Sequence, residues 1–266
     1  MIPYFEFSSI PIGPINIQVW GLFVALGFLF GALVAAKMVR RRGDDPKIIW
    51  DLLGWMILAG LIGGRLGHVL LYDLGYYLDQ PLEIFAIWHG GLSVFGGFIA
   101  CVLIGWWYLR KKQVDGWRYA DSAIFGLPFG LAIGRIGCFL IHDHPGTVTD
   151  FFLGVEYPDG LIHHDHGLYL AINGLALAII FLWITRKRRS VGTYIAVFSI
   201  WYGAVRFGLD FYRLNDVRYA LLTPAQYLSV ALVIFGVVLV VKLRNQPSKN
   251  TFLWKTKKVS SKAVQK

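Results

Sequence analysis

The sequence predicts an all-α membrane protein that crosses the bilayer seven times, with the N-terminus outside and the C-terminus in the cytoplasm. Hydrophobic residues make up 56% of the 266 residues and charged residues 16%, and the mean hydropathy is +0.55. This composition is too apolar for a soluble domain. Several apolar runs also reach the length of about 20 residues that crosses about 30 Å of hydrocarbon. Lysine and arginine gather in alternate loops, which gives the orientation.

The first three helices are expected at 17–39, 50–72 and 90–109. The first ends at the basic cluster 40–42, and the third ends at the basic cluster 110–112. Such clusters are typical of cytoplasmic helix ends. The second helix carries the motif GGRLGH, which places Arg65 on a glycine-rich face. The loop 73–83 has acids but no lysine or arginine, so we expect it on the outer side.

The remaining helices are expected at 120–141, 168–184, 193–211 and 223–241. The loop 142–167 is the longest in the chain and lacks lysine and arginine, which predicts that it faces outward. Residues 1–241 are therefore expected to form one transmembrane domain, and residues 242–266 a basic cytoplasmic tail. The chain has no clear internal repeat, which argues against an inverted-repeat transporter.

Basic residues are distributed unevenly over this topology. Of the 26 lysines and arginines, 21 fall in the tail and in the loops of one side, or at the helix ends that border them. Anionic lipid headgroups attract such clusters, so the net charge of +10 does not indicate nucleic-acid binding. The five exceptions are all arginine: Arg65, Arg135, Arg206, Arg213 and Arg218.

Arg135 is the residue that most clearly predicts a functional site. It lies in the motif GRIGCFLIHDHPG at 134–146, at the end of an apolar run. An arginine at mid-bilayer costs about 2.5–3.5 kcal/mol on translocon scales, so such a residue usually has a function and a partner. Gly134 and Gly137 remove side-chain bulk beside it, which allows close approach of a ligand headgroup or of another backbone. We expect the partner to be an anion.

Arg206 lies at a similar depth in its own helix, near the predicted outer boundary. Arginine keeps its charge and offers a planar fork to phosphate. Two such helices side by side would form a phosphate clamp that faces the outer leaflet. A structural alternative remains for Arg206, because Asp210 lies four residues later and can pair with it on one helix face. A purely structural role is also open for Arg65, which has fewer acids nearby in the sequence.

The loop after Arg135 is rich in metal-binding residue types. A zinc site would draw on His142, His144, His163, His164, Asp165 and His166. The sequence has no HExxH or CxxC spacing, which favours a solvated polar loop, and we expect no metal. Cys101 and Cys138 fall within membrane segments, where small apolar packing is expected and not a disulfide.

The motif at 134–146 resembles the signature of the bacterial prolipoprotein diacylglyceryl transferases. That signature reads glycine, arginine, any residue, glycine, asparagine, phenylalanine, an apolar residue, asparagine, any, glutamate, any, any, glycine. Three further motifs are similar to the family's: GGRLGHVLLYD at 63–73, WHGGLSVFGG at 88–97 and YGAVRFGLDFYR at 202–213. The resemblance covers about residues 20–241. The positions that match the signature in place are Gly134, Arg135, Gly137, Phe139, Leu140 and Gly146.

The resemblance implies an enzyme of the bacterial inner membrane that needs no metal or other cofactor. It would transfer the diacylglyceryl group of phosphatidylglycerol to the lipobox cysteine thiol of an exported prolipoprotein, and glycerol phosphate would leave. Arg135 matches the family's arginine that binds phosphatidylglycerol, and Arg206 matches its second essential arginine. Partners would be this lipid, the prolipoprotein signal peptide and the surrounding membrane lipids. The other expected substrate-binding residues are Gly134, Gly137, Asp143, Gly146, Arg65 and Asp210.

The chain departs from the family pattern at five positions: Trp20, Phe95, Cys138, Ile141 and Asp143. Phe95 stands where some members have a histidine, so the family's assignment of a general base does not carry over directly. The histidines near the outer boundary that could accept a thiol proton are His89, His142 and His144. We expect His144 in the catalytic set, beside the two arginines.

A second function class is a non-enzymatic carrier or channel for an organic anion. A transporter is expected to have charges that can be reached from both faces of the membrane. The intramembrane arginines of this chain cluster toward the predicted outer side, which favours the transferase.

Overall fold

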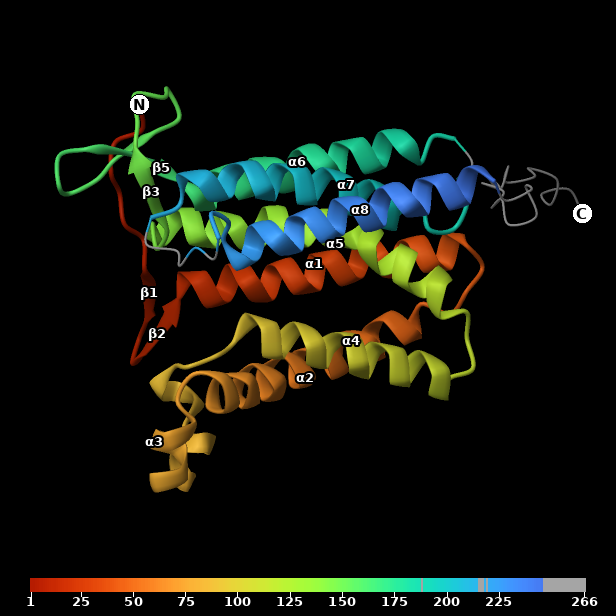
Figure 1. The fold of residues 1–266 in the computed structure, drawn as a ribbon, viewed down its shortest axis with the longest axis horizontal. Coiled ribbons are helices and arrows are strands. Elements are labelled where there is room, and N and C mark those ends of the chain that lie inside the picture. Colours follow the sequence, from red (N-terminus) through yellow and green to blue (C-terminus); the bar gives the residue numbers. More distant parts are fainter. Residues whose placement is uncertain (188, 215–217, 219, 246–266) are drawn as a thin grey trace, which may run out of the picture.

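The computed structural model describes residues 1–187, 189–214, 218 and 220–245 of the chain. Within them, the long helices run between the two ends of the molecule, and successive ones point in opposite directions (Figure 1). Each coincides with a segment that the sequence predicts as helical, with ends that differ by a few residues. The helices are α1 (Val19–Arg41), α2 (Lys47–Leu71), α4 (Val94–Lys111), α5 (Gly116–Ile141), α6 (His166–Ile184), α7 (Thr193–Leu209) and α8 (Pro224–Arg244).

Five of these helices, α1, α2, α5, α6 and α8, are long and apolar enough to cross a membrane. Of the other two, α4 packs along α2, and α7 packs along α8. The chain is therefore a mostly helical protein of the multi-pass membrane type. The basic tail predicted at 242–266 lies outside the described residues from position 246 onward.

Glycines set the distances between neighbouring helices. A Cβ atom added to Gly126 of α5 would lie 2.2 Å from the Gly31 carbonyl oxygen of α1. One added to Gly96 of α4 would lie 2.3 Å from the Gly63 carbonyl oxygen of α2. Backbones can touch at these places only because both helices lack side chains there. These glycine contacts therefore set the close packing of α1 against α5 and of α2 against α4.

A small sheet covers one end of the bundle, beside the N-terminus (Figure 1). Its strands are β3 (Pro145–Val148), β4 (Val155–Glu156) and β5 (Ile162–Asp165), all antiparallel, in the order β3-β5-β4. The sequence predicts a solvated polar loop here, and it gives no sign of these strands. The strands are two to four residues long, which is too short for an alternating pattern to stand out. We call this end of the molecule the sheet end and the opposite one the far end.

The N-terminal segment is folded against the sheet end. It forms a hairpin of β1 (Ser9–Ile12) and β2 (Ile15–Gln18), which leads directly into α1. Ahead of the hairpin, the Phe7 amide donates to the Leu140 carbonyl at the end of α5, and Ile2 pairs with Val155 of β4. These contacts hold the first residues over the end of α5.

The loop between α2 and α4 is also ordered. It contains α3 (Leu74–Asp79) and the short helices η1 (Pro81–Phe85) and η2 (Ile87–His89), which project beyond the bundle at the sheet end (Figure 1). The sequence predicts only a loop at 73–83. Large apolar side chains such as Leu82, Phe85 and Trp88 are exposed there.

At the far end, a buried ion pair ties three helices together. Arg42 Nη2 at the end of α1 lies 2.6 Å from Asp121 Oδ2 on α5. Asp121 Oδ1 accepts the backbone N–H groups of Tyr194 and Ile195 at 2.9 and 3.1 Å, at the start of α7. Arg42 is therefore a structural residue as well as a member of the basic cluster.

Candidate active site

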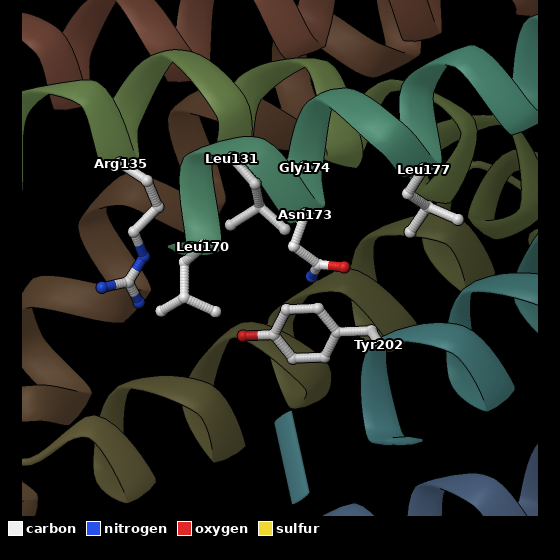
Figure 2. A pocket seen from close by; sticks show the side chains of 7 residues that line it. All are labelled: Leu131, Arg135, Leu170, Asn173, Gly174, Leu177 and Tyr202. Carbon is white, nitrogen blue, oxygen red and sulfur yellow. The ribbon is translucent and has the colours of Figure 1, made fainter. Parts of the chain in front are cut away.

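Arg135 lies on α5, about two turns from the helix end at the sheet end of the molecule. Its side chain lines one edge of a small pocket between α5, α6 and α7 (Figure 2). Its Nη1 lies 3.9 Å from the Cys138 Sγ, a long contact, and no carboxylate among the described residues pairs with the guanidinium. The other residues that line the pocket are Leu131, Leu170, Asn173, Gly174, Leu177 and Tyr202.

The pocket is a narrow, partly open gap between the three helices. Its empty volume is about 240 Å³, open space at the mouth included. Figure 2 shows the Tyr202 hydroxyl on the same side of the pocket as Leu170 and the Arg135 guanidinium. A cation and a hydroxyl beside apolar walls are what a phosphate on an apolar tail requires.

Arg206 lies on α7, one helical turn after Tyr202. Its Nη2 is 3.0 Å from Asp210 Oδ1, so the predicted i, i+4 pair is formed. Asp210 is fully buried; it also lies 3.7 Å from Arg213 Nη1 and accepts a hydrogen bond from the Thr223 hydroxyl. Two guanidinium groups thus share one carboxylate, which orients Arg206 and leaves positive charge in excess. The charge of Arg135 acts on Arg206 across the site.

The signature glycines have different surroundings. A Cβ added to Gly134 would meet nothing within 4 Å, so space beside Arg135 is open there. At Gly137 a Cβ would lie 2.6 Å from the Phe23 Cβ on α1, and at Gly146 it would lie 2.7 Å from the Tyr212 carbonyl oxygen. Gly137 and Gly146 therefore make room for packed protein, and Gly134 alone makes room for a ligand.

Arg65 is 5% exposed and is surrounded by backbone carbonyl groups. Its guanidinium donates to the carbonyls of Ile84 and Ala86 at 2.9 and 3.2 Å, and also to those of Glu83, Gly90 and Gly91. It lies over the Tyr77 ring, 5.1 Å from the centroid. These contacts fasten α3, η1 and η2 to α2. The geometry supports the structural alternative for Arg65 and leaves it no fork for a phosphate.

The expected histidines differ in exposure. His89 is largely exposed, with Nδ1 at 2.9 Å from Glu83 Oε2. The His144 side chain is 41% exposed, and its Nδ1 lies 2.5 Å from Asp143 Oδ1, itself partly exposed. Both ion pairs are at the rim of the sheet end. Neither histidine lines the pocket of Arg135.

His142 is buried at the end of α5. Its Nδ1 lies 2.7 Å from Asp165 Oδ2, and the Tyr157 hydroxyl donates to the same oxygen at 3.0 Å. Burial and the Asp165 carboxylate raise the pKa of Tyr157, so its hydroxyl stays a donor. Aromatic rings surround the imidazole, with centroids at 4.8 Å for Phe5 and 5.2 Å for Phe139. His142 holds the N-terminal segment, β5 and the end of α5 together.

The histidines of the loop do not form a metal site in the described part of the chain, where no group of three or more histidine, cysteine or acidic residues could hold an ion. His163 shows why: its Nδ1 donates to the Gly146 carbonyl at 2.8 Å, and its Nε2 faces Asp159. These side chains are used to hold the sheet together.

The model of the prolipoprotein diacylglyceryl transferase family matches residues 8–242 of this sequence. The chain belongs to this family. It is 35% identical over 260 residues to a phosphatidylglycerol–prolipoprotein diacylglyceryl transferase of Solidesulfovibrio magneticus, an alignment that covers 93% of this chain and 97% of that protein. It is 38% identical over 253 residues to a protein of the same name from Cupriavidus metallidurans, and this alignment covers 90% of this chain and 93% of that protein.

Two departures from the family signature lie together beside Arg135. The Trp20 side chain at the start of α1 lies beside the Cys138 thiol, which is also the sulfur nearest the Arg135 guanidinium. Trp20 stands where the family has a tyrosine, and Cys138 where the signature has asparagine. The two substitutions are therefore in contact and form one side of the arginine's surroundings.

The sequence reasoning missed three residues of this region: Asn173, Tyr202 and His166. Asn173 is the polar residue inside the apolar run of α6, and its Oδ1 accepts the Trp201 indole N–H at 2.8 Å. Tyr202 lies four residues before Arg206, so it shares that arginine's helix face. Both signals were visible in the sequence. His166 was grouped only with the zinc candidates.

Proposed function

We propose that this chain transfers the diacylglyceryl group of phosphatidylglycerol to the lipobox cysteine thiol of exported prolipoproteins, the first step of lipoprotein maturation. Membership of the family supports this function. The observation that carries it to the site is Arg135, an intramembrane guanidinium that lines an open pocket and pairs with no carboxylate among the described residues. Such a group is a ready ligand for a lipid phosphate.

The reaction requires stabilisation of a leaving phosphate. The acceptor thiol loses its proton, and sulfur bonds to the glycerol carbon that carries the phosphate. The carbon–oxygen bond breaks, its electron pair stays on the phosphate oxygen, and glycerol phosphate leaves. A second negative charge develops on the phosphate during this step. Arg135 binds the phosphate of the substrate, and Arg206, held by Asp210, stabilises the developing charge.

The remaining expected site residues have supporting roles in this proposal. Gly134 lets the headgroup approach Arg135, and Asp210 positions Arg206. Gly137 and Gly146 keep α1 and the segment after α7 in place around the site. Asp143 and His144 lie at the rim, where the acceptor peptide would enter.

The membrane topology belongs to the same proposal. Seven crossings would place the N-terminus outside and the C-terminus in the cytoplasm of a bacterial inner membrane. Support comes from the basic clusters 40–42 and 110–112, which lie at the far end, whereas Arg135 and Arg206 lie toward the sheet end. The sheet end, with residues 142–167, would then face outward, where exported substrates arrive.

The test uses the full chain, purified in detergent and placed in vesicles of phosphatidylglycerol labelled in the glycerol that carries its acyl chains. A lipobox peptide is added, and a peptide with serine in place of its cysteine is the matched control. We expect the label on the cysteine peptide alone, through a bond that resists ester hydrolysis. Label moved across the bilayer with no lipidated peptide would instead support a carrier.

A further inference from the structure

One buried histidine beside the proposed clamp has no assigned task. His166 is the first residue of α6 and is 2% exposed. Neither of its ring nitrogens has a hydrogen-bond partner among the described residues. The Tyr212 carbonyl lies close to the ring but outside hydrogen-bonding geometry. Buried polar groups are nearly always paired, so an unpaired imidazole indicates a partner that arrives with the substrate.

The position of His166 points to the same pocket. On α6, Leu170 follows His166 by one turn and Asn173 by two, and both line the pocket of Arg135. From the other side, the charges of Arg206 and Arg213 act on the His166 ring. His166 itself does not line the pocket, but it lies on the same face of α6 as two residues that do, within reach of the charge of the second clamp arginine.

The other expected histidines are less suited to proton transfer. His89 and His144 are exposed and paired with acids, and His142 is bonded to Asp165 and enclosed by aromatic rings. His166 alone among these four combines burial, free ring nitrogens and nearness to Arg206.

We propose that His166 accepts the proton of the lipobox thiol during transfer. This inference rests on the proposed function. Sulfur bonds to the glycerol carbon, the carbon–oxygen bond breaks, and its electron pair leaves on glycerol phosphate. The thiol proton goes to a free ring nitrogen of His166, and from there to the departing phosphate or to water. The positive charges of Arg206 and Arg213 oppose the imidazolium, and the negative charge that develops on the phosphate offsets them during the step.

A pH profile of transfer would also respond to the titratable and charged groups that surround the His166 imidazole. They come from each element that packs around His166, including α5, which contacts the next residue, Gly167. The titratable or charged ones are Arg206, Arg213, Asp210, Asp165, Cys138 and the neighbouring His144, whose carbonyl accepts the His166 amide.

The test compares His166→Gln with His164→Gln in the full-length protein in vesicles. His164 is the control, because it belongs to the same segment but its ring already has partners, the Tyr169 hydroxyl at 2.8 Å and the Tyr212 ring at 4.6 Å between centroids. At neutral pH we expect His166→Gln to slow transfer by about 100-fold or more, the usual contribution of a general base. Transfer should recover as the pH rises and the acceptor thiol ionises. Binding of labelled phosphatidylglycerol should be unchanged.

A selenocysteine peptide separates proton transfer from a structural role. Its selenol is already ionised at neutral pH, so the rate with this peptide should be the same in His166→Gln as in the unmodified protein. An equal loss with both peptides, or no loss with either, overturns the inference. If His166→Gln does not fold, His166→Ala with added imidazole decides: imidazole should raise the rate with the cysteine peptide and not with the selenocysteine peptide, and no rescue overturns the inference. If the unmodified protein lipidates neither peptide, the proposed function itself fails.

Discussion

Among single residues, Arg135 is expected to act through the planar shape of its guanidinium as well as through its charge. We predict that Arg135→Lys lowers transfer by about 100-fold or more, because an ammonium group cannot reproduce the bidentate fork on a phosphate whose charge is growing. The measurement is lipidated peptide formed per folded protein. Arg110→Lys at the far end is the matched control and should leave the rate unchanged. An Arg135→Lys protein with the unmodified rate would contradict the clamp.

Arg206 allows a sharper test, since its pairing with Asp210 has both a structural and a catalytic explanation. We predict that the double variant Arg206→Gln, Asp210→Asn folds, still binds phosphatidylglycerol through Arg135, and remains inactive. Removing both charges leaves no unpaired ion, so a purely structural pair would be restored by the double change. Recovery of transfer to near the unmodified rate would show that Arg206 only balances Asp210.

A functional residue can be predicted from the sequence when its own type and position are unusual enough to indicate a role. An arginine in an apolar run is costly wherever it lies, so Arg135 and the Arg206–Asp210 pair could be found from the sequence. His166 could not, because its burial and its nearness to Arg206 depend on how α6 and α7 pack. Only the fold shows that Arg65 differs in role from Arg135 and Arg206, because backbone carbonyl groups occupy the donors of its guanidinium.

At the scale of elements, glycine contacts position the arginines. We predict that Gly126→Ala destabilises the protein by about 1–3 kcal/mol, the range of an overpacked core, because its Cβ would overlap the backbone of α1. Gly21→Ala on α1 is the control, since a Cβ there meets nothing within 4 Å. Thermal unfolding in detergent measures both. Equal melting temperatures would show that α1 and α5 are not fixed by this contact.

Helices and strands were not equally predictable. An apolar run of membrane length is a long signal, and all the segments chosen by hydropathy are helical. The strands of the sheet end are two to four residues long and are held by side chains such as His163, which bonds Gly146 across the sheet. That order comes from tertiary contacts, which no local pattern records.

At the scale of the whole molecule, the proposed orientation determines which substrates can reach the site. We predict that a reporter fused after Lys112 or Arg189 lies in the cytoplasm, and that one inserted near Asp150 lies outside. Accessibility to a membrane-impermeant label in intact cells measures this. Cytoplasmic labelling near Asp150 would place the sheet end, and the pocket with it, on the wrong side for an exported peptide.

The central claim is that the site breaks the bond between the glycerol carbon and the phosphate of phosphatidylglycerol as it lipidates a thiol. The most direct measurement uses phosphatidylglycerol labelled in its headgroup, the purified chain and a lipobox peptide, with both products counted in one reaction. The account predicts one glycerol phosphate released for each thioether-linked diacylglyceryl peptide formed. Lipidated peptide without glycerol phosphate, or free glycerol in its place, would contradict it.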